Sequence, residues 1–115
     1  GVSMAAIEAR AASLSSFFIE CVEARCPSLV LASPRDPAKR GAHVSFRHPH
    51  AYAAMQALID RRVIGDVRMP DLIRFGFAPL YNSHDEALRA AEVLGDIMAS
   101  DAWDDPRYHQ RSKVI

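Results

Sequence analysis

The run LIRFGFA at residues 72–78 alternates large apolar residues with small or charged ones, and this alternation constrains the fold more than any other feature. Successive side chains of a β-strand point to opposite faces, so a period of two predicts a strand with one buried face. The buried face is expected to comprise Ile73, Phe75 and Phe77. The opposite face is expected to comprise Leu72, Arg74, Gly76 and Ala78. Burying each of the three apolar side chains contributes about 1.5 to 3 kcal/mol, which fixes the register of the strand and the direction of Arg74.

Arg74 is the unusual residue of this strand, because it shares its face with Gly76 and Ala78, which have almost no side chain. Small residues in a strand often mark a place where another group approaches the backbone closely. A carboxylate would match the guanidinium, which can bind it through two parallel hydrogen bonds. The other interpretation is a solvated face of arginines that has no function, since exposed charges are common. The alternation alone leaves both interpretations open.

A long helix is predicted from residue 3 to about residue 25. Apolar or small residues recur there at steps of three and four, at Met4, Ile7, Ala11, Leu14, Phe18 and Cys21. This spacing is typical of an amphipathic helix. Further apolar residues widen the stripe, namely Ala5, Ala6, Phe17, Ile19 and Val22. A helix that is apolar on more than one side in so short a chain predicts a second partner, either another domain or another subunit.

The rest of the chain contains further strand-like and helical segments. Residues 42–48 and 63–69 resemble strands, and the second of them is joined to 72–78 by a tight turn at Pro70-Asp71. Residues 29–31 form a short hydrophobic segment that leads into a proline-interrupted loop. Helices are predicted over residues 50–62 and 84–100, and Ser83 with Glu86 forms a capping box at the start of the second. The segment 101–115 is polar apart from Trp103 and Tyr108, and it is expected to pack loosely or fray.

These elements predict an α+β fold with two layers. A mainly antiparallel sheet of three or four strands is expected to carry helices on one face and to be preceded by the long N-terminal helix. The most apolar strand, 72–78, is expected to be central. Val44 and Phe46 should then face the helices. The helix-free face of the sheet is expected to comprise His43, Ser45, Arg47 and Arg74.

The composition excludes several classes of protein. The chain has 14 basic and 14 acidic residues, so its net charge gives no indication of nucleic-acid binding. The aromatic residues of the strands belong to the buried set, whereas RNA-binding sheets display theirs on the open face. No apolar run reaches the roughly 18 residues that span a bilayer, and the N-terminal sequence lacks the pattern of a signal peptide. We therefore expect a cytoplasmic protein that binds neither nucleic acid nor membrane.

The histidines and cysteines give weaker indications. His43, His48 and His50 lie close together in the sequence, but they have no cysteine or carboxylate beside them, so no metal site is predicted. Cys21 and Cys26 fall on different sides of the predicted helix. This arrangement favours reduced thiols over a disulfide.

Residues that could perform catalysis are also few. Ser83 is interpreted as a helix cap and not as a nucleophile, and the sequence lacks the common nucleophile, nucleotide and zinc motifs. Arginine outnumbers lysine 12 to 2, and Lys39 and Lys113 lie in a proline-rich loop and in the polar tail. Neither lysine has the apolar surroundings of a Schiff-base amine. No catalytic residue is predicted on this chain.

Three stretches resemble the C-terminal part of kynureninase, a pyridoxal-phosphate enzyme of the aspartate aminotransferase fold (fold type I). They are the long first helix, SPRDPAKRGAHVSF at residues 33–46 and VIGDVRMPDLIRFGFAPLYNSHDE at residues 63–86. The resemblance covers residues 1 to about 100. Its most specific part is the R-x-x-x-A-P-L-Y-N-S run at residues 74–83.

The resemblance implies that the chain is a C-terminal fragment. Residues 1–26 would form a long interdomain helix, residues 27–100 a small α+β domain and residues 101–115 a polar tail. The residues that bind pyridoxal 5'-phosphate would lie in the missing large domain, and no cofactor is expected on this fragment. The full-length homodimer would hydrolyse L-kynurenine to anthranilate and L-alanine in tryptophan catabolism, whereas the fragment alone would be inactive.

The resemblance also implies a role for one residue. The family's arginine at the position of Arg74 binds the α-carboxylate of the substrate, whereas no role is assigned to Tyr81 and Asn82, which match the rest of the motif. The first helix would meet the missing domain, so the isolated fragment is expected to expose apolar surface and to self-associate. The alternative interpretation is a freestanding α+β domain that binds a small molecule or has a regulatory role.

Overall fold

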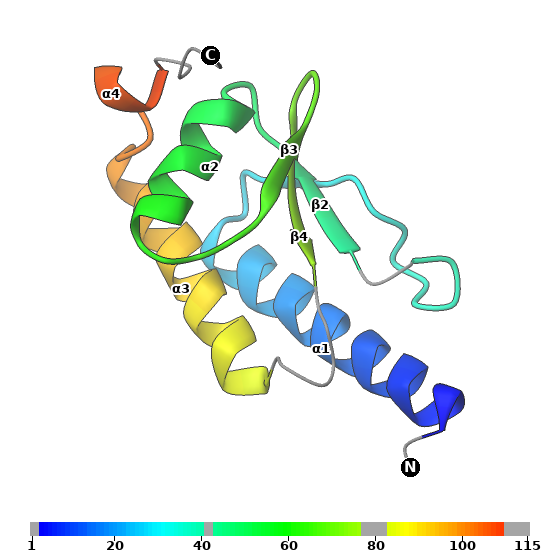
Figure 1. Cartoon of the computed structure of the whole chain (residues 1–115). Helices are drawn as coiled ribbons and strands as arrows, with labels where there is room; N and C mark the ends of the chain where they lie inside the picture. Colours follow the sequence, from blue (N-terminus) through cyan, green and yellow to red (C-terminus); the bar gives the residue numbers. More distant parts are fainter. Residues whose placement is uncertain (1–2, 41–42, 77–82, 110–115) are drawn as a thin grey trace, which may run out of the picture.

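The structure, a computed structural model, describes residues 3–40, 43–76 and 83–109. Four helices and four strands follow one another in these ranges (Figure 1). The helices are α1 (Met4–Arg25), α2 (Ala51–Asp60), α3 (His84–Ser100) and the short α4 (Pro106–His109). The strands are β1 (Val30–Leu31), β2 (His43–Arg47), β3 (Asp66–Arg68) and β4 (Leu72–Gly76). The predicted order of helix, strand, helix, strand, strand and helix is found from α1 to α3, and the structure adds the short strand β1 and the helix α4, which the sequence did not predict.

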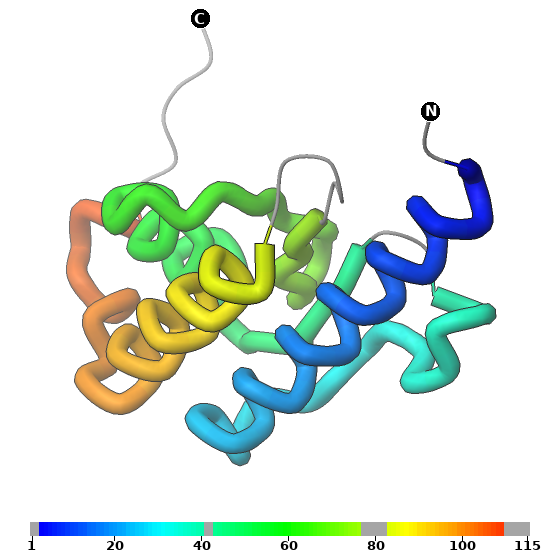
Figure 2. The backbone as a smooth tube through the Cα atoms, turned by 90° about the horizontal axis from the view of Figure 1, so that it is seen from below, coloured from blue at the N-terminus to red at the C-terminus, as the bar shows by residue number. Residues whose placement is uncertain are grey.

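The strands form one antiparallel sheet in the order β1-β2-β4-β3. β4 is an interior strand, as its apolar character predicted. Figures 1 and 2 show α1 and α3 side by side beneath the sheet, and α2 packs against β3 and β4. This arrangement confirms the predicted α+β fold, with a four-stranded sheet, helices on one face and a long first helix.

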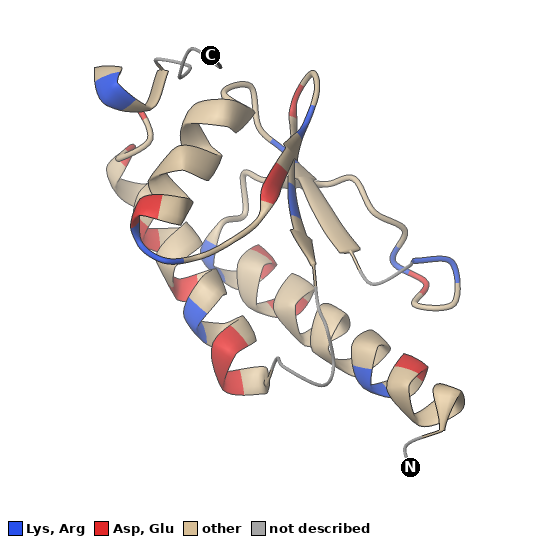
Figure 3. Ribbon diagram, viewed as in Figure 1, with Lys and Arg blue, Asp and Glu red and all other residues tan. Residues whose placement is uncertain are grey.

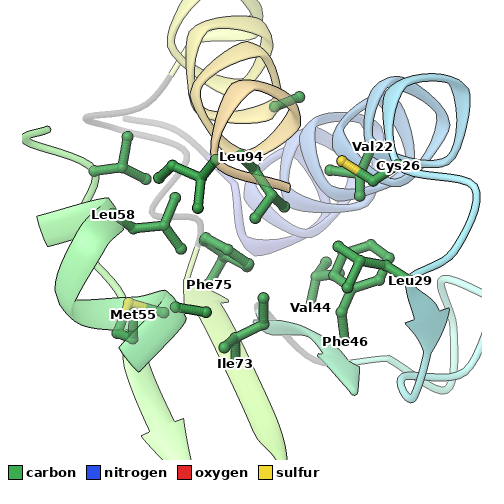
Figure 4. Close-up of a cluster of buried hydrophobic side chains, with 14 of the residues drawn as sticks. Val22, Cys26, Leu29, Val44, Phe46, Met55, Leu58, Ile73, Phe75 and Leu94 are labelled. Atoms are coloured by element: carbon green, nitrogen blue, oxygen red, sulfur yellow. The ribbon is translucent and has the colours of Figure 1, made fainter. Parts of the chain in front are cut away.

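The core lies between the sheet and the helices. Val44, Phe46, Ile73 and Phe75 are all buried, and Figure 4 shows these side chains directed from the two interior strands toward the helices. The ring of Phe18 on α1 lies 4.9 Å from the ring of Phe75 and 6.3 Å from that of Phe46, measured between centroids. The alternation therefore identified the buried face of both strands correctly. Phe77 and Ala78 lie outside the described residues.

Helix α1 is buried along only part of its length. The hydroxyl of Ser3 caps the helix by accepting from the N–H of Ala6 at 3.1 Å. Its buried residues begin at its midpoint: Leu14, Ser15, Phe18, Ile19 and Val22. Met4 near the start is 68% exposed. The extra apolar surface that the sequence predicted is therefore concentrated in the first half of the helix.

Helix α3 begins and packs as its sequence predicts. The hydroxyl of Ser83 accepts from the N–H of Glu86 at 3.2 Å, which confirms Ser83 as the N-cap. α3 packs against α1. A Cβ atom at Gly95 would lie 3.1 Å from the Cβ of Arg25 on α1. The glycine thus allows the two helices to approach closely at this point.

The described part of the tail is ordered, so the expectation of loose packing was wrong for residues 101–109. Tyr108 in α4 is 8% exposed, and its hydroxyl donates to Oδ2 of Asp60 at 2.8 Å. The ring of Trp103 stacks on that of His50 with a centroid distance of 4.9 Å. The two aromatic residues of this otherwise polar segment hold it against α2, because they bury apolar area at little entropic cost.

Both cysteines are free thiols, as predicted. Cys26 is buried, and this desolvation raises the pKa of its thiol, which keeps it protonated and unreactive. Within the described ranges, no helix combines the length and the apolar character that crossing a bilayer requires.

Candidate functional site

Arg74 lies in the middle of β4, on the face of the sheet that carries no helices. Its neighbours in register are Ser45 on β2 and Asp66 on β3. The side chain of Arg74 keeps 23% of its accessible surface, so it lies partly covered on the sheet. The alternation of residues 72–76 therefore predicted the direction of this side chain correctly.

Asp66 binds Arg74 through two hydrogen bonds. The Nε–H of Arg74 donates to Oδ1 of Asp66 at 2.9 Å, and Nη2 donates to Oδ2 at 2.7 Å. Figure 3 shows the acidic segment of β3 beside the basic segment of β4. These hydrogen bonds lower the pKa of the Asp66 carboxyl and raise the pKa of the Arg74 guanidinium. Both groups therefore remain charged across the neutral pH range.

The contact with Asp66 occupies one edge of the guanidinium. A guanidinium has five N–H donors in one plane, and Asp66 takes the edge formed by Nε and Nη2. Among the described residues, the contacts of Arg74 engage Nε and Nη2 and leave Nη1 without an acceptor. The end of the fork, formed by Nη1 and the second N–H of Nη2, has the geometry to bind a further carboxylate with two parallel hydrogen bonds.

The charges around Asp66 leave one positive charge in excess. Nη2 of Arg68 lies 4.0 Å from Oδ2 of Asp66, on the same carboxylate that Arg74 binds. Two guanidinium groups thus share one carboxylate. A group of net charge +1 suits a ligand with a single carboxylate.

The surface beside Arg74 at Gly76 is not open to a ligand. This corrects the interpretation that the small side chain of Gly76 leaves room for one. His43 on β2 is the register partner of Gly76. A Cβ atom added to Gly76 would lie 3.3 Å from Cδ2 and 3.4 Å from Nε2 of the His43 ring. The group that approaches the backbone at Gly76 is therefore this imidazole.

Ser45 also differs from its predicted exposure. It is 9% exposed, although the alternation places it on the helix-free face. Its N–H donates to the hydroxyl of Ser33 at 2.8 Å, and its carbonyl accepts from Ala32 at 2.9 Å. The chain that follows β1 thus lies against β2 at this point, an arrangement that a period of two does not report.

The other histidines lie elsewhere. His48 is buried, and its Nδ1 accepts from the N–H of His50 at 2.9 Å, while both rings pack around Trp103. Burial lowers the pKa of His48, so its imidazole is neutral at pH 7. No group of three or more His, Cys, Asp or Glu in the described parts of the chain is placed to hold a metal ion.

Arg40 is a buried arginine that the sequence did not identify. It is 6% exposed, and it donates to the hydroxyls of Ser15 and Ser16 on α1 at 2.8 Å each. Its Nη1 donates to the carbonyls of Pro34 and Arg35 at 3.1 and 3.0 Å. Burial lowers the pKa of this guanidinium. Arg40 therefore binds the proline-rich loop to α1, a structural role that depends on contacts distant in sequence.

The four-stranded antiparallel sheet with helices on one face defines this chain as a small α+β domain, and Arg74 lies partly engaged on the open face. Its sequence matches the family of the kynureninase C-terminal domain over residues 7–94, and the chain therefore belongs to that family. The match confirms the resemblance found in the sequence. Tyr81 and Asn82, which belong to the same motif as Arg74, lie outside the described residues.

Similar proteins agree with this assignment. Kynureninase of Pseudomonas fluorescens is 47% identical over 113 residues, which are 96% of this chain and 27% of the relative. The kynureninases of Burkholderia mallei and Burkholderia pseudomallei are 44% identical over 113 residues, with the same shares of the two chains. The chain thus spans 27% of the length of these curated relatives and corresponds to their C-terminal domain.

Proposed function

We propose that this chain is the C-terminal domain of a pyridoxal-phosphate-dependent hydrolase that converts L-kynurenine to anthranilate and L-alanine. In this proposal Arg74 binds the α-carboxylate of the substrate. The observation that carries it is the position of Arg74 on the helix-free face, with one edge bound by Asp66 and the other edge without an acceptor among the described residues. A carboxylate held by such a fork is fixed in both distance and orientation, which is how positioning lowers a reaction barrier.

The cofactor would be bound by the rest of the protein. Lys39 is exposed in a turn of the proline-rich loop, where its N–H donates to the carbonyl of Asp36, so it does not fit a cofactor-binding lysine. Pyridoxal phosphate, when bound, supplies the electron sink for the cleavage of a carbon-carbon bond. The chain described here would contribute substrate binding and would be inactive by itself.

The exposed first half of α1 supports a missing partner. Met4, Ala5 and Ala6 are exposed although they are apolar. We propose that the large domain covers this surface in a cytoplasmic homodimer. The isolated chain is accordingly expected to self-associate and to bind a hydrophobic dye, with Ile7→Asp reducing both effects. A strictly monomeric chain in sedimentation measurements, with no dye binding, would contradict this part of the proposal.

The role of Arg74 can be tested in the full-length protein by Arg74→Lys. Lysine keeps the charge but cannot reproduce the planar fork, so kcat/KM for L-kynurenine is expected to fall by about a hundredfold or more. The visible absorbance of the bound cofactor should stay unchanged, because Arg74 is not proposed to touch it.

Arg47→Lys is a matched control for this experiment. Arg47 lies on the same face of the sheet and forms its own ion pair, with Nη1 3.1 Å from Oδ1 of Asp71. Its replacement should leave the kinetics unchanged. Unaltered turnover in Arg74→Lys would remove Arg74 from the site, and a reading frame whose start signal lies near residue 1 would instead favour a freestanding binding domain.

A further inference from the structure

We propose that Asp66 is a positioning residue, which holds the guanidinium of Arg74 in the orientation that presents its open end to the carboxylate of the ligand. This inference rests on the proposed function of Arg74 and extends it to a second residue. Asp66 is not proposed to touch the substrate. It acts through Arg74.

The first argument is the way the hydrogen bonds divide the fork. An arginine side chain has several rotatable bonds, and an exposed one samples many orientations of its guanidinium plane. Asp66 holds Nε and Nη2 at 2.9 and 2.7 Å, which fixes the plane at two points. The donors that remain, on Nη1 and Nη2, then point in one defined direction. The ligand carboxylate meets a fork that is already oriented.

The second argument is that the backbone of the β3–β4 hairpin fixes the position of Asp66 beside Arg74. Asp66 and Arg74 are register partners in the hairpin of β3 and β4. The preceding residue, Gly65, approaches β4 so closely that an added Cβ would lie 2.5 Å from the carbonyl oxygen of Arg74 and 2.9 Å from Cε of Met55. No residue with a Cβ fits there without displacement. The close contact at Gly65 therefore fixes the start of β3 and the position of the carboxylate.

The third argument is the balance of charge. An unpaired arginine would attract any anion, including inorganic anions and dicarboxylates. Asp66 compensates one of the two charges of Arg68 and Arg74, and its own carboxylate would repel a second carboxylate at the same place. Asp66 thus both orients the site and suits it to a ligand with one carboxylate.

The test uses Asp66→Asn in the full-length holoenzyme, with Asp66→Ala as a second variant. Asparagine keeps the size of the side chain but presents an amide group to one nitrogen of the fork, so the paired contact is lost. The matched control is Asp71→Asn, which disrupts the neighbouring pair with Arg47. Thermal unfolding is measured for all variants, so that a general loss of stability is recognised.

Three measurements separate positioning from a structural role. The KM for L-kynurenine and the Kd for L-alanine, measured by calorimetry, are expected to rise between about tenfold and a hundredfold in both Asp66 variants. The inhibition constant of kynuramine, which lacks the carboxylate of kynurenine, should change less than twofold. The control variant should match the unmodified protein in all three measurements.

The possible results distinguish this inference from the function on which it rests. If Arg74→Lys impairs turnover while the Asp66 variants do not, the inference is wrong and the proposed function stands. An equal loss of binding for L-alanine and kynuramine would assign Asp66 a structural role and also overturn the inference. If neither Arg74→Lys nor the Asp66 variants alter kynurenine turnover, the proposed role of Arg74 fails with it.

Discussion

Arg40 and Arg74 are two arginines of the same small domain with opposite environments. Arg40 is almost completely enclosed, and its donors are bound by hydroxyls and carbonyls of α1 and the proline-rich loop. Arg74 is partly exposed, and in the part of the chain that the structure describes one carboxylate, that of Asp66, binds one edge of it. A guanidinium with all its donors satisfied stabilises a fold, whereas one that is oriented but incompletely bonded is available to a ligand. If Arg74 has the proposed role, the number of donors without an acceptor among the described residues distinguishes the two arginines better than charge does.

The largest expected effect that separates the two arginines is on stability. Arg40→Ala removes donors from two carbonyls and two hydroxyls in a buried region, and it is expected to lower the free energy of unfolding by about 2 to 4 kcal/mol. Urea denaturation of the chain measures this change. Arg74→Ala should alter stability far less, because Asp66, the partner of Arg74, is half-exposed and can be solvated in the variant. A reversed order of the two effects would break the comparison.

A smaller effect is expected from Gly65→Ala. The added Cβ would meet the carbonyl oxygen of Arg74, so β3 must shift, and overpacking of this kind costs about 1 to 3 kcal/mol. The variant should also weaken the pair of Asp66 and Arg74 while leaving the contacts of Arg40 intact. Urea denaturation combined with the kynurenine KM of the full-length protein tests both expectations. Gly76→Ala, which meets only the edge of the His43 ring, is a milder control.

The smallest expected effect is on the pH dependence of stability. The pKa of Asp66 is lower in the folded chain than in the unfolded one, because Arg74 donates to its carboxylate. Its contribution is therefore present above the unfolded pKa of about 3.9 and is lost as the pH falls through the folded pKa. Asp66→Asn should reduce the loss of stability at acid pH, that is, the acid limb of a plot of unfolding free energy against pH, whereas Arg40→Ala should not. Identical acid limbs in the unmodified protein and in both variants would mean that the pair of Asp66 and Arg74 contributes no measurable stability.

Local patterns in the sequence predicted much of this structure. The alternation at residues 72–76 identified the buried face of β4 and the direction of Arg74, since burial of Ile73 and Phe75 leaves no other register. The cap at Ser83 was equally predictable, because its partner lies three residues away. These features depend on neighbours along the chain.

Features that depend on distant contacts were missed. The pair of Asp66 and Arg74 could have been found by counting outward from Pro70, since the two residues are equally far from the centre of the turn. Arg40 gave no such signal, because its partners Ser15 and Ser16 lie on another element. The packing of Trp103 on His50 could likewise not be predicted from hydrophobic periodicity or from capping residues, because the two rings are distant in sequence.

The uneven burial of α1 has a mechanical consequence. The second half of the helix is clamped to α3 and to the aromatic core beneath the sheet, while the first half extends beyond them for about 15 Å, at 1.5 Å per residue. Helices of this length are stiff, so the two halves move together. The same helix therefore carries an exposed apolar surface at one end and, at the other, the ring of Phe18, which packs on Phe75 of β4.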